Sequence, residues 1–240
     1  MTFRVAGGTG SGGTPVFVGG KYGAFHYDYT TTLSGELTQQ ATTIPVTSTT
    51  GFSTAGAIVI DYEVVSYTGI TSNSFTGCTR GAYGTAATSH SSGAYVGGAQ
   101  GASANTVTLL QINTTDLSAG VSLTASSEMQ VDATGIYSVT FSVQCANAGN
   151  APDNFTVWAR QNGTDIPSSA SISTTPSVHG GIPGASIVCI NLFLSLMAND
   201  KVQLYWATDS GNTVVVTYPA STSPAHPASP AVIATVQQVS

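Results

Sequence analysis

Within residues 135–145, apolar and polar side chains alternate strictly from Tyr137 to Cys145. In the stretch GIYSVTFSVQC, the apolar positions are Tyr137, Val139, Phe141, Val143 and Cys145. Successive side chains of a β-strand point to opposite faces of a sheet, so a period of two predicts a strand with one buried face. The pattern recurs in DKVQLYWAT, where the apolar positions are Val202, Leu204 and Trp206.

The remaining sequence favours strands as well. No stretch places apolar residues at the three-and-four spacing of an amphipathic helix. Thr, Val, Ser, Tyr and Gly dominate, and turn-forming residues divide the chain into many short segments. This pattern is typical of β-barrels and β-sandwiches, so we expect an all-β protein.

The segment IVCINLFLSLM, residues 187–197, is apolar on both of its faces. One face carries Val188, Ile190, Leu192, Leu194 and Leu196. The opposite face carries Ile187, Cys189, Phe193 and Met197. A strand that is apolar on both faces is buried on both. In a sandwich, one face meets the other sheet, so the second face most simply meets another copy of the chain.

Charged residues make up only 7% of the chain, against roughly 25% in ordinary soluble proteins. Either Ser, Thr, Asn, Gln and Gly keep the surface soluble, or neighbouring subunits cover much of it; we favour the second. The formal net charge is −6 and only five residues are Lys or Arg. We therefore expect neither a nucleic-acid partner nor a basic membrane-binding helix.

The chain divides into three zones by composition. We expect an extended arm over residues 1–34, a small β module over 35–98, and a larger β domain over 105–240 after the weak linker GGAQGASAN. The arm combines many glycines with aromatic side chains, so we expect it to order only on a partner. Its candidate contact residues are Phe3, Phe17, Tyr22, Phe25, Tyr27 and Tyr29.

The stretch EVVSYTGITSNSFTGCTRGAYGTAATSH, residues 63–90, gathers unusual chemistry for this chain. Glu63 and Arg80 are opposite charges on segments that could pair, which predicts a structural ion pair inside a small barrel. The catalytic alternative joins Cys78 and His90, with Glu63 or Asp61 orienting the histidine. We prefer the structural role, because nothing in the sequence suggests a charged pocket that would lower the thiol pKa.

No other segment predicts a chemical site. The Asp residues are scattered through turns without the density of a calcium loop. GGTGSGG lacks the Gly-Lys-Ser/Thr of a phosphate loop. The N-terminus shows no secretory pattern, and the longest apolar run is too short to span a bilayer. We expect no enzyme activity, no cofactor and no metal.

Two segments resemble structural proteins of tailed-bacteriophage virions. Residues 56–96 are similar to a small module recurrent there, through Glu63, Tyr67-Thr68-Gly69, Thr76–Gly81, Gly84-Thr85, His90 and Gly93–Val96. Residues 130–240 resemble a jelly roll of the C1q or tumour-necrosis-factor type. The matching features are Gly135-Ile136-Tyr137, Val157-Trp158, Asn162-Gly163 and Ile166–Ser169.

The resemblance implies a homotrimer with one jelly-roll sandwich per subunit. The function it implies is a capsid decoration (cement) protein that stabilises the phage head, made in the host cytoplasm and located on the capsid surface. Its partners would be itself and the major capsid protein. The alternative is a short tail or head fibre that binds a host-surface glycan or other receptor.

Overall fold

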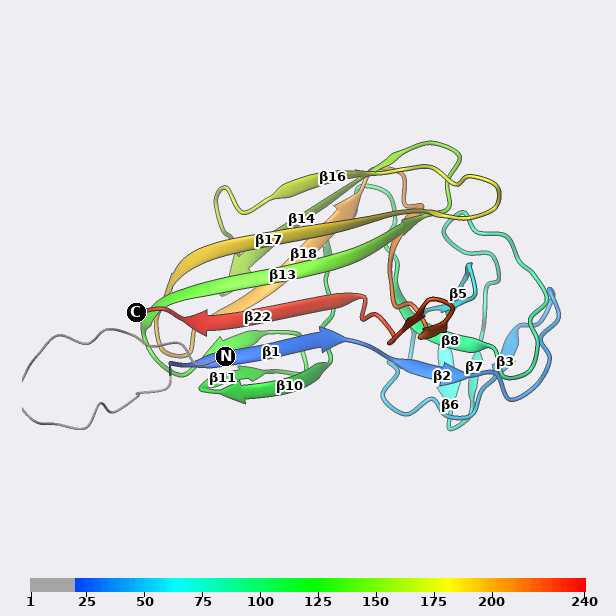
Figure 1. Cartoon of the computed structure of the whole chain (residues 1–240), viewed down its shortest axis with the longest axis horizontal. Helices are drawn as coiled ribbons and strands as arrows, with labels where there is room; N and C mark the ends of the chain where they lie inside the picture. The colour runs from blue at the N-terminus through cyan, green and yellow to red at the C-terminus, as the bar shows by residue number, and fades with distance from the viewer. Residues whose placement is uncertain (1–19) are drawn as a thin grey trace, which may run out of the picture.

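A computed structural model describes residues 20–240, which contain 22 strands and no helix (Figure 1). The first eleven strands are β1 (Tyr22–Tyr27), β2 (Thr30–Thr32), β3 (Thr43–Pro45), β4 (Gly56–Ile60), β5 (Glu63–Tyr67), β6 (Gly69–Thr71), β7 (Ser74–Thr76), β8 (Tyr95–Gln100), β9 (Thr108–Leu109), β10 (Thr114–Ala119) and β11 (Val121–Leu123). The others are β12 (Met129–Val131), β13 (Gly135–Asn147), β14 (Asp153–Gln161), β15 (Thr164–Asp165), β16 (Ser171–Thr175), β17 (Gly184–Leu196), β18 (Lys201–Thr208), β19 (Thr213–Val216), β20 (Ser221–Thr222), β21 (Ala225–His226) and β22 (Val232–Gln238).

The strands form antiparallel sheets, which confirms the all-β prediction. The largest sheet has ten strands in the order β10-β1-β22-β13-β19-β8-β4-β5, with β17 also paired to β13 and β2 to β8. The second sheet has seven strands in the order β11-β12-β18-β14-β15, with β16 on β14 and β9 on β18. Two smaller sheets, β3-β7-β6 and β20-β21, complete the described chain.

The two large sheets share one hydrophobic core. The predicted inner face of β13 is fully buried, and so are Val202, Leu204 and Trp206 of β18. Phe155 of β14 stacks on Trp206 with ring centroids 5.3 Å apart. In Figure 1, β14 and β18 lie behind β17 and β13. The inner faces of both sheets therefore meet, and their outer faces point away from each other.

The two longest strands form one continuous antiparallel ladder. β13 and β17 pair antiparallel in register over all 13 residues, from Gly135↔Leu196 to Asn147↔Gly184. β22 and then β19 pair along the other edge of β13. Within residues 20–240, β17 pairs with no strand besides β13. The outer edge of β17 therefore presents free backbone groups, as an edge strand does.

The small β module has an apolar cluster of its own, but its sheet continues into the large one. The cluster runs from Leu33 to Val96 in sequence and includes Ile58, Val65 and Phe75. Strand β8 closes the module and also pairs with β19 of the larger part. The expected linker is thus partly wrong, because Gly97 to Gln100 lie within β8 and are buried.

The glycines of β8 serve close packing rather than flexibility. A Cβ atom on Gly98 would lie 2.9 Å from the hydroxyl of Tyr27 and 3.0 Å from its ring. Tyr27 is itself buried in the core shared by the two large sheets. Gly98 therefore lets the module approach the sandwich at a distance that no larger side chain would permit.

The described part of the expected arm is not an extended arm. Strand β1 pairs with β10 along one edge and meets β22 at Tyr27↔Val232. Phe25 is 0% exposed and Tyr27 is 4% exposed, because both point into the chain's own core. The amide of Gln238 also donates to the carbonyl of Lys21 at 2.7 Å. Residues 22–32 are therefore part of the sandwich and the module.

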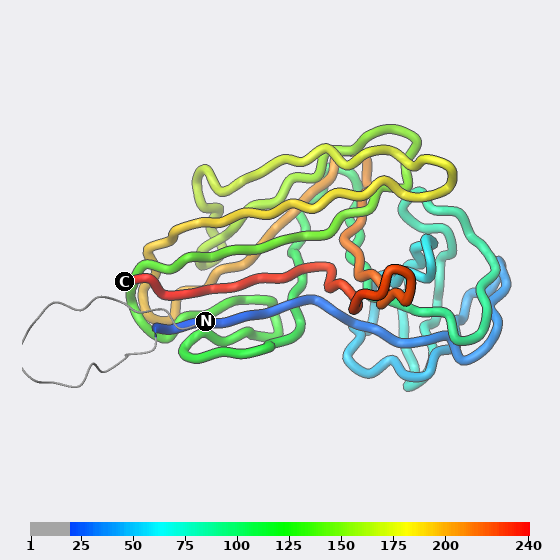
Figure 2. The backbone as a smooth tube through the Cα atoms, in the orientation of Figure 1, coloured from blue at the N-terminus to red at the C-terminus, as the bar shows by residue number. Residues whose placement is uncertain are grey.

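Both ends of the described chain lie at one end of the molecule. Figure 2 shows that the start of β1 and the C-terminus lie side by side, while the small module occupies the opposite end. Within residues 20–240, no helix has the length and apolar character needed to cross a membrane.

Candidate subunit interface

The outer face formed by β22, β13 and β17 collects exposed apolar side chains. Because β17 alternates, its odd-numbered residues point outward while Val188, Leu194 and Leu196 are buried. The four interface candidates all lie on this outward face. Ile187, Phe193 and Met197 are 67%, 69% and 70% exposed, and Cys189 is exposed as well.

Neighbouring strands extend the same face with small polar and apolar groups. Ser138 of β13 lies directly opposite Phe193, and Gln144 lies opposite Ile187. On β22, Ile233 pairs with Ser142 and is itself exposed. Asn191 donates from its side-chain nitrogen to the hydroxyl of Ser138 at 2.9 Å. Some polar side chains between the apolar residues thus find their hydrogen-bond partners within the same face.

No residue of β13, β17 or β22 carries a charged side chain. A solvent-facing sheet surface normally carries charges that keep it soluble and block edge pairing. Here more than thirty residues of three adjacent strands lack them, while large apolar side chains stand exposed in one row. A surface of this kind is typical of a contact with another protein.

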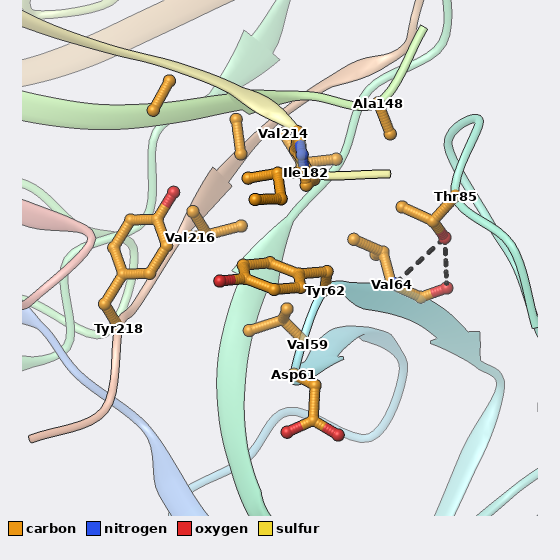
Figure 3. A pocket seen from close by; sticks show the side chains of 13 residues that line it. Val59, Asp61, Tyr62, Val64, Thr85, Ala148, Ile182, Val214, Val216 and Tyr218 are labelled. Atoms are coloured by element: carbon orange, nitrogen blue, oxygen red, sulfur yellow. Dashed lines mark hydrogen bonds between the residues drawn. The ribbon is translucent and has the colours of Figure 1, made fainter. Parts of the chain in front are cut away.

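At the Gly184 end of β17, the same outer face leads to a cavity of about 250 Å³, which β4, β5 and β19 also line (Figure 3). Ala185, two residues before Ile187 on the same face, lines this cavity together with Ala146 of β13. Its remaining lining residues are Val59, Asp61, Tyr62, Val64, Thr85, Ala148, Ile182, Pro183, Val214, Val216 and Tyr218. Figure 3 shows the rings of Tyr62 and Tyr218 on either side of Val216.

A second candidate, the pair Glu63–Arg80, forms a buried ion pair in the small module. The Nε of Arg80 donates to Glu63 Oε1 at 2.7 Å, and Nη2 donates to Oε2 at 2.8 Å. Both side chains are almost completely shielded from solvent. Arg80 also donates to the carbonyls of Thr38 and Thr88. This bidentate geometry ties the loop 77–90 to strand β5.

His90 and Asp61 join the same cluster. His90 Nε2 lies 2.8 Å from Glu63 Oε2, and Nδ1 lies 2.8 Å from Asp61 Oδ2. Since both ring nitrogens face carboxylate oxygens, both act as donors when the ring is protonated. The cluster then balances two positive charges, on Arg80 and His90, against the two carboxylates.

The pKa values in the cluster favour this ionised state. Burial opposes ionisation of Glu63, but hydrogen bonds from His90, Arg80 and the amides of Thr88 and Gly81 outweigh it and lower its pKa to about 2. The pKa of His90 is raised, first by its hydrogen bond to Glu63 and against the effect of burial, with a further contribution from Asp61. The cluster is therefore a set of buried ion pairs that holds the loop 77–90 against β5.

Cys78 takes no part in the cluster. Burial raises the pKa of its thiol to about 11, so the thiol is protonated at neutral pH. Within residues 20–240, no hydrogen bond joins Cys78 to His90, and no group of three His, Cys, Asp or Glu side chains is arranged to hold a metal ion. The geometry thus offers no activated cysteine nucleophile.

The capsid-contact candidates divide into four groups. Phe3 and Phe17 lie outside the described residues. Phe25 and Tyr27 point into the protein's own core, so the expectation that they contact a capsid is wrong for this fold. Tyr29 is half-buried between the two apolar clusters. Among the candidates that the structure describes, only Tyr22 is exposed, at 40%.

In the sequence, His90 entered only the catalytic alternative, with Glu63 or Asp61 orienting it; its place in the structural Glu63–Arg80 ion pair was not predicted. His90 contacts Glu63 and Asp61 across 27 and 29 residues, respectively. The sequence feature that could have revealed this role is that Asp61, Glu63, Arg80 and His90 lie within 30 residues of a chain with few charges. By contrast, the Asn162-Gly163 turn was visible locally: both residues have positive φ, 51° and 82°, and they join β14 to β15.

Comparisons with known proteins give this chain no family. No family model matches the sequence, and no curated protein is significantly similar to it.

Proposed function

We propose that the protein is a structural component of a tailed-bacteriophage virion, a homotrimeric decoration protein of the capsid. The observation that supports this proposal is the uncharged outer face of β22, β13 and β17. Its exposed row of Ile187, Phe193 and Met197 suits burial against other subunits. In this proposal, the two large sheets form the jelly roll of each subunit and this face lines the threefold contact.

The remaining features agree with a structural role. The Glu63–Arg80–His90 cluster ties loops to strands inside the module, and the Cys78 thiol is protonated. Contact with the major capsid protein would fall to residues outside the sandwich core, with Tyr22 as the described aromatic candidate.

Sedimentation velocity tests the subunit contact. We expect the full chain to sediment as a trimer at micromolar concentration, and Phe193→Asp to sediment as a monomer, because assembly would bury an unpaired charge. Val107→Asp is the matched control, since Val107 is also exposed, at 52%, but precedes β9 of the other sheet. A monomeric wild-type protein would refute the interface.

The alternative is a short tail or head fibre that binds a receptor on the host surface. It is favoured by one observation, a partly exposed cluster of aromatic and charged side chains on the outer face of β14 and β18. The copy number per virion separates the two functions. Hundreds of copies indicate decoration of the capsid surface, whereas a few tens or fewer indicate a fibre.

A further inference from the structure

The two tryptophans of the chain have opposite environments. Trp206 of β18 is completely buried in the core between the sheets. Trp158 of β14 points to the outer face, since its neighbours Val157 and Ala159 are buried. Most of this protein's surface carries Ser, Thr, Gly, Asn and Gln, so a partly exposed tryptophan is an exception that calls for a cause.

Trp158 is the centre of an ordered cluster on that face. It pairs directly across the ladder with Tyr205 of β18. The two rings are nearly parallel, with an interplanar angle of 29° and centroids 6.3 Å apart. The next outward-facing residue of β14 is Arg160, whose guanidinium carbon lies 3.9 Å from the centroid of the Tyr205 ring. Two aromatic rings and a planar cation thus share one surface.

Asp165 fixes these side chains in place. Its Oδ1 accepts from Trp158 Nε1 at 2.7 Å and from Arg160 Nε at 2.6 Å. These contacts raise the pKa of Arg160, first through its hydrogen bond to Asp165, and they lower the pKa of Asp165 for the same reason. Within residues 20–240, the second oxygen of Asp165 accepts no hydrogen bond. Asp165 Oδ2 can therefore accept a hydrogen bond from a ligand beside the rings.

Gln203 adds a second planar polar group. It lies directly opposite Arg160 across the β14–β18 ladder. Its side-chain nitrogen donates to the carbonyl of Ser126 at 3.0 Å. This hydrogen bond fixes the orientation of the Gln203 side-chain amide. The cluster therefore places the partly exposed rings of Trp158 and Tyr205 beside fixed donors and acceptors.

We propose that this cluster of Trp158, Tyr205, Arg160, Asp165 and Gln203 is a binding platform for a neutral pyranose of a cell-surface glycan. A pyranose has an apolar C–H face, which packs on aromatic rings, and hydroxyl groups around its edge. Adjacent hydroxyls can donate to a carboxylate and accept from a guanidinium in the same plane. Because Asp165 and the ring packing already hold these side chains, little conformational entropy is lost on binding.

Local charge favours a neutral ligand over an anionic one. Arg160 is the only cation in the cluster, and Asp165 neutralises it at 2.6 Å. A nucleic acid or phosphorylated partner requires several unpaired cations, which the cluster does not supply. The platform also faces away from the uncharged face of β22, β13 and β17, since the inner faces of both sheets share one core. Glycan binding and subunit contact can therefore occur together.

Binding of the full-length protein to an array of neutral hexose and N-acetylhexosamine oligosaccharides tests the proposal. We expect the wild-type protein to bind at least one saccharide, and Trp158→Thr to bind it about tenfold more weakly or worse, as for a central aromatic anchor. Threonine is chosen because it suits an outward position of a strand. Soluble saccharide should also protect Trp158 from fluorescence quenching by acrylamide.

Two further variants separate recognition from folding. Arg160→Lys keeps the charge but loses the planar fork, so it should weaken binding without changing the melting temperature by more than a few degrees. Gln130→Ala, on the same sheet in β12, is the control and should bind like the wild type. The proposal is wrong if the wild-type protein binds no saccharide, or if Trp158→Thr and Arg160→Lys bind as tightly as the wild type. Neither result depends on the outcome of the sedimentation experiment.

Discussion

Glu63 and His90 lie 2.8 Å apart, carboxylate oxygen to ring nitrogen, with both side chains only 1% exposed. The pair joins the first strand residue after the Asp61-Tyr62 turn to the loop that closes the module. Arg80 contacts the same carboxylate from the other side at 2.7 Å. Glu63 thus holds the loop 77–90 at two separate points, Arg80 and His90.

Removing the charge of Glu63 should destabilise the protein strongly. Glu63→Gln leaves Arg80 and His90 buried without their main counter-charge, which typically costs about 3–5 kcal/mol. Urea denaturation of the two proteins measures the change in the free energy of unfolding. Glu36→Gln is the matched control, because Glu36 is exposed and belongs to the same module. Equal losses for both variants would contradict a structural role for the cluster.

The cluster should also give the protein a pH-dependent stability. His90 has a raised pKa in the folded state, so its contribution is complete below its unfolded value of about 6.5 and is lost as pH rises through the folded value. The pKa of Glu63 is lowered to about 2, so its contribution is complete above its ordinary value of about 4.5 and is lost as pH falls toward 2. Both contributions to stability are therefore complete between about pH 4.5 and pH 6.5.

Melting temperatures between pH 3 and pH 9 test this dependence. The wild-type protein should exceed His90→Gln by the largest margin between about pH 4.5 and pH 6.5, and the margin should narrow at higher pH. His226→Gln serves as the control, since His226 is an exposed histidine of the short strand β21. A margin that grows with pH would show that His90 is bound in its neutral form.

Cys189 offers a direct probe of the uncharged face. In the isolated subunit it is exposed, whereas Cys78 and Cys145 are buried. If subunits cover the face, maleimide should label Cys189 slowly in the wild-type assembly and rapidly in Phe193→Asp. Mass spectrometry counts the modified thiols, and unfolding in denaturant gives the full count of three. Equal labelling rates in the two proteins would place the subunit contact elsewhere.

Gly98→Ala should loosen the junction between the module and the sandwich. The added Cβ would lie about 3 Å from the hydroxyl and ring of Tyr27, which is buried and cannot move freely. Overpacking of this kind typically costs about 1–3 kcal/mol. Gly35→Ala is the control, since a Cβ there meets nothing within 4 Å. A loss in thermal stability for Gly98→Ala alone would confirm the steric cause.

The sequence predicted the strands whose apolar and polar residues alternate. The inner face of β13, the inner face of β18 and the outward row of β17 all follow directly from a period of two. The Asn162-Gly163 turn was equally local, because few residue pairs tolerate two positive φ angles. These features depend only on neighbours in the chain.

Long-range pairing explains what the sequence did not reveal. The segment 22–27 also alternates, with Phe25 and Tyr27 inward and His26 outward, but the glycines before it suggested an arm. Its partners are β10 and β22, about 90 and 210 residues away, and no local pattern specifies them. For His90 the sequence offered Glu63 and Asp61 as alternative partners of a catalytic histidine, but not that both bind it at once beside Arg80.

Two truncations should separate the part of the N-terminal zone that belongs to the fold from the part available to a partner. Deleting residues 1–30 removes β1, and with it the buried rings of Phe25 and Tyr27. Loss of each buried ring typically costs about 3–5 kcal/mol, which is comparable to the whole stability of a domain. This variant should fail to unfold cooperatively. Deleting residues 1–19 keeps every described strand, so this variant should unfold like the full chain.

The shorter truncation is therefore the one that tests contact with a capsid. If residues 1–19 grip the major capsid protein, their deletion should abolish binding to expanded capsids while the assembly still forms. That contact should resist moderate salt, because Arg4 is the only charged side chain in the segment. Cosedimentation with capsids at low and moderate salt measures both effects. Undiminished binding by the protein that lacks residues 1–19 would assign the gripping surface to the folded part, with Tyr22 as its first aromatic candidate.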